Sequence, residues 1–362
     1  MKTRLMMLGL VFALVVILAA CATPTPVTVV QTKVVEATKI VEATKIVEAT
    51  KIVEKVVTPT PPPPAPYPVK GITINVPWSP GGGTDRTTRA LAAILEKEFK
   101  QPVGVVNRTG GGGVVGHTAT ATADPDGYTL GAVTVEIAMM NWLGTTSLTY
   151  KDYKPIALLI NNRAGITVRA DAPWKDYKAL IDDIKANPGK YKASGTAAGG
   201  IWDLARVAWL KAAGLTPDHV KWVPSTGAAA ALAELAAGGV DICTCSPAEA
   251  LPMAQAGKAR ILAVMADKRW SVLPDVPTLK ELGADVDIGG WAGIAAPART
   301  PDYIIDILDK AVAKAVQSPE FAEFIKTSGF WMDYKGAKDF AAFMAKEQDK
   351  YGVLLKEGGF IK

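Results

Sequence analysis

Strand-like apolar runs alternate with helical patterns along most of the chain. Residues 71–77 predict a strand, and the apolar positions of residues 91–99 recur at the spacing of an amphipathic helix. Residues 155–160 and 260–265 are further apolar runs of strand length, and residues 228–237 predict another helix. Such alternation is typical of an α/β fold.

The N-terminal residues follow a different pattern. Lys2 and Arg4 precede an apolar run over residues 5–18, which is shorter than the roughly 20 residues of a bilayer span and predicts an export signal. The run ends in Leu-Ala-Ala-Cys21, which resembles the lipobox of bacterial lipoproteins. The resemblance implies that residues 1–20 are a lipoprotein signal peptide and that lipidated Cys21 anchors the chain to the outer face of the cell membrane. The alternative is an ordinary signal peptide with an unmodified cysteine.

Residues 21–66 contain a repeat and a proline tract. The hexapeptide Thr-Lys-(Val/Ile)-Val-Glu-Ala begins at positions 32, 38 and 44, and proline dominates residues 58–66. A period of six does not maintain a heptad seam, and a polyproline stretch is extended. We interpret residues 21–66 as a lipid-anchored, low-complexity stalk; pairing of chains through the repeats is the alternative.

Composition narrows the function. The 362 residues carry a formal net charge of +5. When the signal and stalk are set aside, 33 basic and 31 acidic residues remain, which is a net charge of +2. This near balance argues against nucleic acid as a partner. Two His and three Cys in the whole chain argue against a multi-ligand zinc site and a disulfide framework, and we expect no metal and no cofactor.

The first glycine-rich loop predicts an anion site. Residues 78–85 read Trp-Ser-Pro-Gly-Gly-Gly-Thr-Asp between the first strand and the first helix, with Thr84 or Asp85 placed to cap that helix. Glycines allow close approach of the backbone, and the free N–H groups of a helix start favour negative charge. The alternative is a tight turn that simply needs glycines. No Gly-Lys-Ser/Thr follows, so it is not a Walker loop.

The second glycine-rich loop matches a dinucleotide fingerprint. Residues 111–116 fit G-x-G-x-x-G, and Glu136 lies 20 residues beyond Gly116. This pattern suggests a dinucleotide-dependent oxidoreductase, which we do not favour. Another glycine loop and helix precede the motif, and the following helix lacks large apolar residues. An exported protein also has no ready supply of reduced nicotinamide.

No catalytic group can be assembled convincingly from the sequence. His117 and His219 fall in turns and connections, where we expect ordinary histidines. Nothing basic neighbours Cys243 or Cys245 in sequence, so we expect free buried thiols. We therefore do not expect an enzyme.

Several segments together resemble one family, the tricarboxylate-transporter receptors (Bug, or TctC-like). The first three signatures are residues 76–85, 106–116 and 123–130, and the similarity continues through residues 223–227, 237–241, 256–264, 273–278 and 291–297. The resemblance covers residues 70–362 in the right order. It implies the type II periplasmic-binding-protein fold, with two α/β domains and a ligand cleft between them. We place the domains at 67–168 plus 291–362 and at 169–290.

The same resemblance implies a function and partners. The expected protein is an extracytoplasmic solute-binding lipoprotein that captures a small organic carboxylate by hinge closure. It would deliver this solute to a permease with one large and one small integral membrane subunit. We expect a monomer. The alternative is a ligand sensor for a signalling partner.

Motif matching assigns ligand binding to main-chain amides and hydroxyls of two facing loops and to neighbouring positions. The predicted residues are Trp78, Ser79, Gly81, Gly82, Gly83, Thr84, Asp85, Ser194, Thr196, Ala197, Gly199, Thr226 and Gly227. For Asp85, bonds to its own loop are favoured over ligand contact. Asp203 stands where the family usually has His, and it either caps a helix or competes with an anionic ligand. Glu249 closes a Ser-Pro-Ala-Glu capping box, with cleft contact as the alternative.

Overall fold

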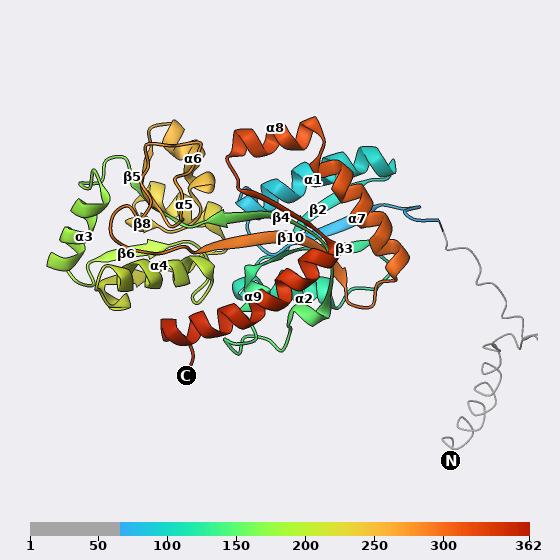
Figure 1. The fold of residues 1–362 in the computed structure, drawn as a ribbon, viewed down its shortest axis with the longest axis horizontal. Helices are drawn as coiled ribbons and strands as arrows, with labels where there is room; N and C mark the ends of the chain where they lie inside the picture. The colour runs from blue at the N-terminus through green and yellow to red at the C-terminus, as the bar shows by residue number, and fades with distance from the viewer. Residues whose placement is uncertain (1–65) are drawn as a thin grey trace, which may run out of the picture. The chain divides into compact units, whose positions relative to one another are not determined.

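The computed structural model describes residues 66–362, which contain two β-sheets with helices on their faces (Figure 1). The predicted signal peptide, Cys21 and the stalk lie outside the described residues, apart from Pro66. Two lobes are defined by the sheets. The larger lobe comprises residues 66–163 and 289–362, and the smaller lobe comprises residues 165–288.

The larger lobe is built on a six-stranded mixed sheet with the order β11-β4-β10-β3-β1-β2. Its strands are β1 (Ile72–Val76), β2 (Val103–Asn107), β3 (Thr129–Thr134), β4 (Tyr153–Arg163), β10 (Gly289–Pro297) and β11 (Met332–Gly336). β1 pairs in parallel with β2 and β3, whereas β10 runs antiparallel to β3 and β4. The predicted strands at 71–77 and 155–160 are therefore confirmed as β1 and part of β4.

Helices cover both faces of this sheet. They are α1 (Gly83–Phe99), α2 (Val114–Ala121), α7 (Asp302–Val316), α8 (Pro319–Ser328) and α9 (Ala337–Gly358). Figure 1 shows α1 and α8 above the sheet and α2 and α9 below it. α7 packs against α1 and β4. Leu91 and Leu95 of α1 are buried against the sheet, as the helical spacing predicts.

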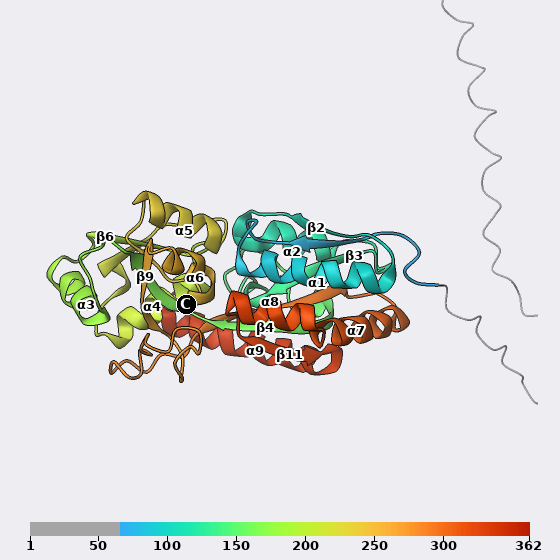
Figure 2. The ribbon, with the colours of Figure 1, turned by 90° about the horizontal axis from the view of Figure 1, so that it is seen from above.

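The smaller lobe has a five-stranded sheet with the order β7-β6-β8-β5-β9. Its strands are β5 (Gly165–Arg169), β6 (Tyr191–Ser194), β7 (Val220–Trp222), β8 (Ile242–Cys243) and β9 (Ala259–Val264). Its helices are α3 (Tyr177–Ala186), α4 (Ile201–Ala212), α5 (Ala228–Ala237) and α6 (Pro247–Gln255). Seen from above in Figure 2, these elements lie beside the larger lobe. The helix predicted at 228–237 coincides with α5.

Two chain segments join the lobes, and they lie side by side. β4 of the larger sheet ends at Arg163, and β5 of the smaller sheet begins at Gly165. Ala164 N donates to Ile288 O at 2.9 Å, and Met265 N donates to Ala164 O at 2.8 Å. The chain therefore passes from one sheet to the other at Ala164 and again directly after Ile288. The predicted domain boundaries, after residues 168 and 290, lie near these two crossings.

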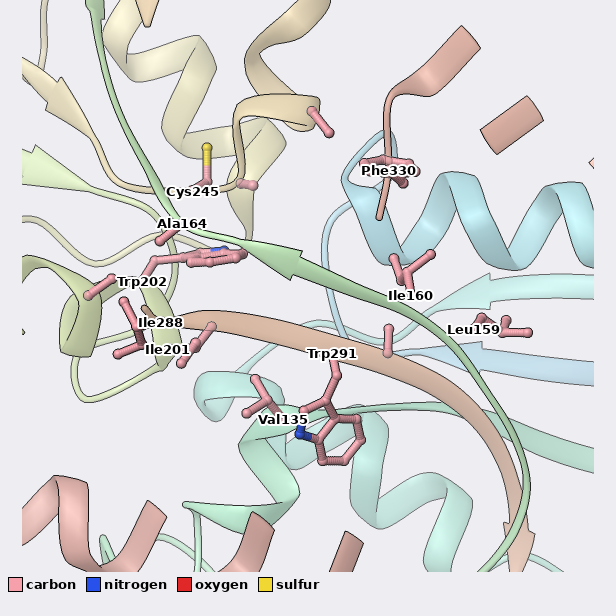
Figure 3. Packing of buried hydrophobic residues seen from close by; sticks show 14 of the residues in the cluster. Val135, Leu159, Ile160, Ala164, Ile201, Trp202, Cys245, Ile288, Trp291 and Phe330 are labelled. Atoms are coloured by element: carbon pink, nitrogen blue, oxygen red, sulfur yellow. The ribbon is translucent and has the colours of Figure 1, made fainter. Parts of the chain in front are cut away.

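One buried apolar cluster extends through both lobes. Ile160 and Trp291 from the larger lobe belong to the same cluster as Ile201 and Trp202 from α4 (Figure 3). Apolar burial of this extent is the main favourable term in folding. The mixed α/β fold predicted from the alternating pattern is confirmed.

Candidate functional site

A cavity of about 50 Å³ lies where the two lobes meet. Five predicted site residues line it: Trp78, Gly82, Gly83, Thr84 and Thr196. Trp78 follows β1, Gly82 to Thr84 form the start of α1, and Thr196 follows β6. Both loops therefore leave the carboxyl ends of strands, where ligands bind in open α/β sheets.

The first glycine loop leads into α1 without a side-chain cap. The helix begins at Gly83 with Gly82 as its N-cap, so the prediction that Thr84 or Asp85 caps it is wrong. Both residues lie in the first turn, because Gly82 already has the extended backbone that an N-cap needs. The three glycine amides at this end already have acceptors within the protein: Asp85 Oδ2 for Gly81, Ser79 O for Gly82 and Glu249 Oε1 for Gly83.

Asp85 holds the loop rather than lining the cavity. Its carboxylate accepts hydrogen bonds from Gly81 N at 2.9 Å, Asn107 Nδ2 at 2.8 Å and Arg89 Nε at 3.0 Å. Burial raises the pKa of Asp85, but the bonds from Arg89, Gly81 and Asn107 outweigh it and hold this pKa below its ordinary value. The loop-holding role favoured by the sequence fits these contacts.

Ser79, Thr226 and Gly227 come together across the lobes. Ser79 N donates to Thr226 O at 3.1 Å, and a Cβ on Gly227 would lie 2.7 Å from Ser79 Oγ. Gly227 also has φ +148°, which favours glycine. These residues form a contact between the lobes, outside the cavity lining.

Ser194 and Thr196, the two hydroxyl residues of the smaller-lobe loop, have different roles. Ser194 Oγ donates to Val223 O at 2.7 Å and is fully buried, so this hydroxyl serves the lobe itself. Thr196 is 4% exposed, and its Oγ1 has no hydrogen-bond partner. A buried hydroxyl without a partner is costly. Thr196 Oγ1 is therefore the free polar group on this side of the cavity.

Ala197 and Gly199 lie around a second cavity, of about 470 Å³. Gly111 and Gly112 of the second glycine loop line the same space, and a Cβ on Gly112 would lie 3.2 Å from the Cβ of Ala197. The dinucleotide-like motif therefore faces the other lobe. Its Gly112 has φ +67°, a conformation that glycine supplies at little cost.

Asp203 stabilises the start of α4 internally. Its Oδ2 accepts from Gly199 N at 3.0 Å, and its Oδ1 forms an ion pair with Arg206 Nη2 at 2.7 Å. Both side chains are more than 90% buried. Asp203 therefore bonds within the first turn of α4 and the residue before it, and it is not part of the cavity lining.

Glu136 lines the cavity, and the sequence suggested it only as an acid of the disfavoured nucleotide motif. It follows β3, and its Oε2 accepts from Thr134 Oγ1 at 2.6 Å. Thr134 Oγ1 in turn accepts from Trp78 Nε1 at 3.2 Å. The other oxygen, Oε1, accepts from Ile201 N of α4 at 3.4 Å, so Glu136 links the larger lobe to the first residue of a smaller-lobe helix.

His117 belongs to the same network. It is 1% exposed on α2, so the expectation of an ordinary histidine in a turn is wrong. Its Nε2 lies 3.2 Å from Thr134 Oγ1, and that oxygen already donates to Glu136. His117 Nε2 is therefore the donor, and burial lowers the pKa of the ring to about 3.

Glu249 makes the reciprocal link. Its Oε2 accepts from Ser246 N at 3.2 Å and closes the predicted capping box of α6. Its Oε1 accepts from Gly83 N of α1 at 2.8 Å. Both interpretations of Glu249 therefore apply, because the side chain caps its own helix and also lines the cavity.

Burial shifts both cavity carboxyl groups toward the neutral form. It raises the pKa of Glu249 to about 7, against the hydrogen bonds from Gly83 and Ser246 and the charge of Arg86. It also raises the pKa of Glu136, against the bonds from Thr134 and Ile201. The charge of Glu136 further raises the pKa of Glu249, as expected for two acids in one cavity.

The sequence also missed several uncharged lining residues. They include Asn162, Ile201, Trp202 and Trp291. Trp291 begins the family-like segment of residues 291–297, and Trp202 directly follows the predicted smaller-lobe loop of residues 194–199. These positions are the signals that could have found them.

Other chemistry is limited within the described residues. The part of the chain from 66 to 362 holds no cluster of three or more His, Cys, Asp or Glu side chains suited to a metal ion. None of its helices is both long and apolar enough to cross a membrane. Cys243 and Cys245 are buried free thiols with their sulfur atoms 3.0 Å apart, as expected.

Comparison with known proteins identifies the family. Residues 87–360 match the family described as tripartite tricarboxylate transporter family receptor, TctC. A UPF0065 protein of Cupriavidus necator is 30% identical over 299 residues, covering 82% of this chain and 90% of the relative. BugT of Bordetella pertussis is 29% identical over 303 residues, covering 81% and 90%.

Solved structures agree. MatC of Rhodopseudomonas palustris, solved with bound malate, has a TM-score of 0.73 and 26% identity and covers 80% of this chain and 100% of its own. A second R. palustris protein, solved with adipate, has a TM-score of 0.76 and 26% identity over 81% and 99%. The periplasmic-binding-protein fold is thus confirmed. The chain belongs to the tripartite tricarboxylate transporter receptor (TctC, or Bug) family of solute-binding receptors.

Proposed function

We propose that this receptor captures a small organic carboxylate between its lobes and delivers it to a tripartite tricarboxylate transporter permease. One observation carries the proposal: a cavity where the lobes meet, lined by the glycine loop of one and the buried, unpartnered Thr196 Oγ1 of the other. Relatives of similar fold were solved with malate and adipate, which supports an organic acid as the ligand.

Hinge closure would trap the ligand. Within residues 66–362, two short segments join the lobes, at Ala164 and next to Ile288, and they are hydrogen-bonded to each other. A pair of adjacent crossing strands suits a rotation of one lobe against the other. We propose that the domain division near these positions is the one that moves. Small-angle scattering of the unaltered protein with and without ligand would test hinge closure. Identical curves would exclude it.

The binding proposal is tested by a thermal-shift screen over organic acids. A ligand at about 100 times its dissociation constant stabilises the folded protein by about 2.7 kcal/mol. For any acid that shifts the melting temperature, Thr196→Val should weaken binding about tenfold, since it removes one hydrogen bond to the ligand. Thr327→Val is the matched control, because Thr327 is exposed on α8 and donates only within its helix. If no organic acid shifts the melting temperature, the proposal fails.

The remaining parts of the proposal need cells. Lipid anchoring at Cys21 predicts that Cys21→Ser releases the protein from membranes. Deletion of the receptor should abolish uptake of the bound acid; a pure sensor would leave uptake unchanged. We also propose a monomeric receptor that returns its ligand unaltered, which light scattering and chromatography of the recovered ligand can check.

A further inference from the structure

The charged groups that line the cavity are both acidic. Glu136 and Glu249 are its ionisable lining residues, and no Lys, Arg or His of residues 66–362 joins them there. The two carboxyl groups come from opposite lobes; Glu136 is 4% exposed, and Glu249 is partly buried. Arg86 lies outside the cavity lining, with its Cζ 5.0 Å from the centroid of the Phe330 ring. Its positive charge lowers the pKa of Glu249 but does not outweigh the effect of burial.

These carboxyl groups already occupy amides that an anionic ligand would need. Glu249 Oε1 accepts from Gly83 N, the first residue of α1, and Glu136 Oε1 accepts from Ile201 N, the first residue of α4. Each lobe therefore places its own carboxyl group on the helix start of the other lobe. The partial positive charge of both helix starts is thus met by the protein itself.

A doubly charged ligand fits such a cavity poorly. A second ligand carboxylate would stand beside Glu136 and Glu249 with no lining cation, so it would repel their ionised forms and raise both pKa values further. An ammonium or another N–H group would instead find acceptors in Glu136 and Glu249. The indole rings of Trp78 and Trp202 also line the cavity, and aromatic rings attract cations.

We propose that Glu136 and Glu249 set the charge selectivity of this receptor: its ligand carries a single carboxylate and presents an ammonium or other N–H donor group to these two side chains. This inference rests on the proposed function and narrows it from organic acids in general to amino-substituted organic acids. Thr196 Oγ1, the unpartnered hydroxyl, remains free for the carboxylate end.

The test compares matched ligands on the whole protein. Isothermal titration at pH 7.5 would measure succinate against 4-aminobutyrate, glutarate against 5-aminopentanoate, and adipate against 6-aminohexanoate, with aspartate and glutamate added. In each pair an aminomethyl group replaces one carboxyl group while the chain length is kept. We expect at least one amino acid to bind ten or more times more tightly than its dicarboxylate partner.

Variants then assign the selectivity to the two residues. Glu249→Gln and Glu136→Gln keep the shape and remove the charge, so each should reduce the preference at least tenfold by weakening the amino ligand and strengthening the dicarboxylate. Glu96→Gln is the matched control, since Glu96 is an exposed carboxylate that also accepts a backbone N–H, from Val103 at 3.1 Å. Circular dichroism checks that each variant folds.

The outcomes separate the two proposals. Tighter binding of dicarboxylates by the unaltered protein overturns the charge inference and leaves the organic-acid receptor intact. A preference that survives both glutamine variants also overturns the inference. If neither set of ligands binds, the proposed function fails and the inference falls with it. The comparison on the unaltered protein holds even if a variant does not fold.

Discussion

At the residue scale, Glu249 is a partly buried acid that connects α6 to α1 and has a raised pKa. Its neutral form is favoured in the folded protein, so the folded state binds this proton more tightly than the unfolded chain does. The stability from this group is therefore fully present below its ordinary pKa of 4.5 and is lost as the pH rises through about 7.

This linkage predicts the behaviour of Glu249→Gln. The variant cannot ionise, so relative to the unaltered protein its free energy of unfolding should rise between pH 4.5 and pH 8, by up to about 3 kcal/mol. Urea denaturation at several pH values measures the difference. A difference that does not change with pH would show that Glu249 titrates normally.

For His117, the dependence of stability on pH has the opposite sign. Burial lowers the pKa of its ring from 6.5 to about 3, so its contribution to stability is present above pH 6.5 and is lost as the pH falls toward 3. His117→Gln should therefore gain stability relative to the unaltered protein over this range, by up to about 5 kcal/mol. His219→Gln is the control, because the side chain of His219 bonds only to Thr216, three residues away in the same turn. Parallel acid-unfolding curves for all three proteins would contradict the prediction.

At the scale of elements, the start of α4 depends on the buried pair of Asp203 and Arg206. Removing one partner of a buried ion pair leaves an uncompensated charge, which costs about 3 kcal/mol or more. Asp203→Asn should lower the free energy of unfolding by that amount, as measured by urea denaturation.

A matched control exists on α8. Lys326 and Glu323 have the same i,i+3 spacing but are 81% and 63% exposed, with 4.0 Å between their charged atoms. Exposed pairs contribute little, so Glu323→Gln should leave stability almost unchanged. Equal losses for the two variants would show that burial does not strengthen the α4 pair.

At the scale of the whole described region, the contact between the lobes can be locked. A Cβ on Gly81 would lie 3.9 Å from the Cβ of Ala229, which is close to the spacing of about 3.8 Å in disulfides. The double variant Gly81→Cys and Ala229→Cys should crosslink on oxidation and slow ligand entry, with recovery on reduction. Because Gly81 has φ +83°, a cysteine there costs about 1–2 kcal/mol.

Stopped-flow tryptophan fluorescence would follow this effect on ligand entry. Each single cysteine variant controls for the loss of the glycine or alanine alone. Unchanged binding rates in the oxidised, crosslinked protein would mean that ligand enters without separation of these loops.

Much of this architecture could be predicted from the sequence. The alternating apolar pattern indicated an α/β fold, and the helix of residues 228–237 and the capping box of Ser246 and Glu249 were predicted at their observed positions. Local features of this kind depend on periodicity and on side chains a few residues apart, so they can be found without tertiary contacts. Of the predicted site, Trp78, Gly82, Gly83, Thr84 and Thr196 line the cavity because both loops follow strand ends.

Only the tertiary structure decided where the acids and the buried histidine lie. Glu136 and Ile201 are 65 positions apart, and Gly83 and Glu249 are 166 apart, so no local pattern links them. Ser79 and Thr226 likewise meet only because the lobes pack together. The sequence by itself determined the elements, the glycine loops and the family. Tertiary packing placed Glu136 and Glu249 in the cavity. Their burial raises their pKa values, and the helix starts of the other lobe supply their hydrogen-bond donors.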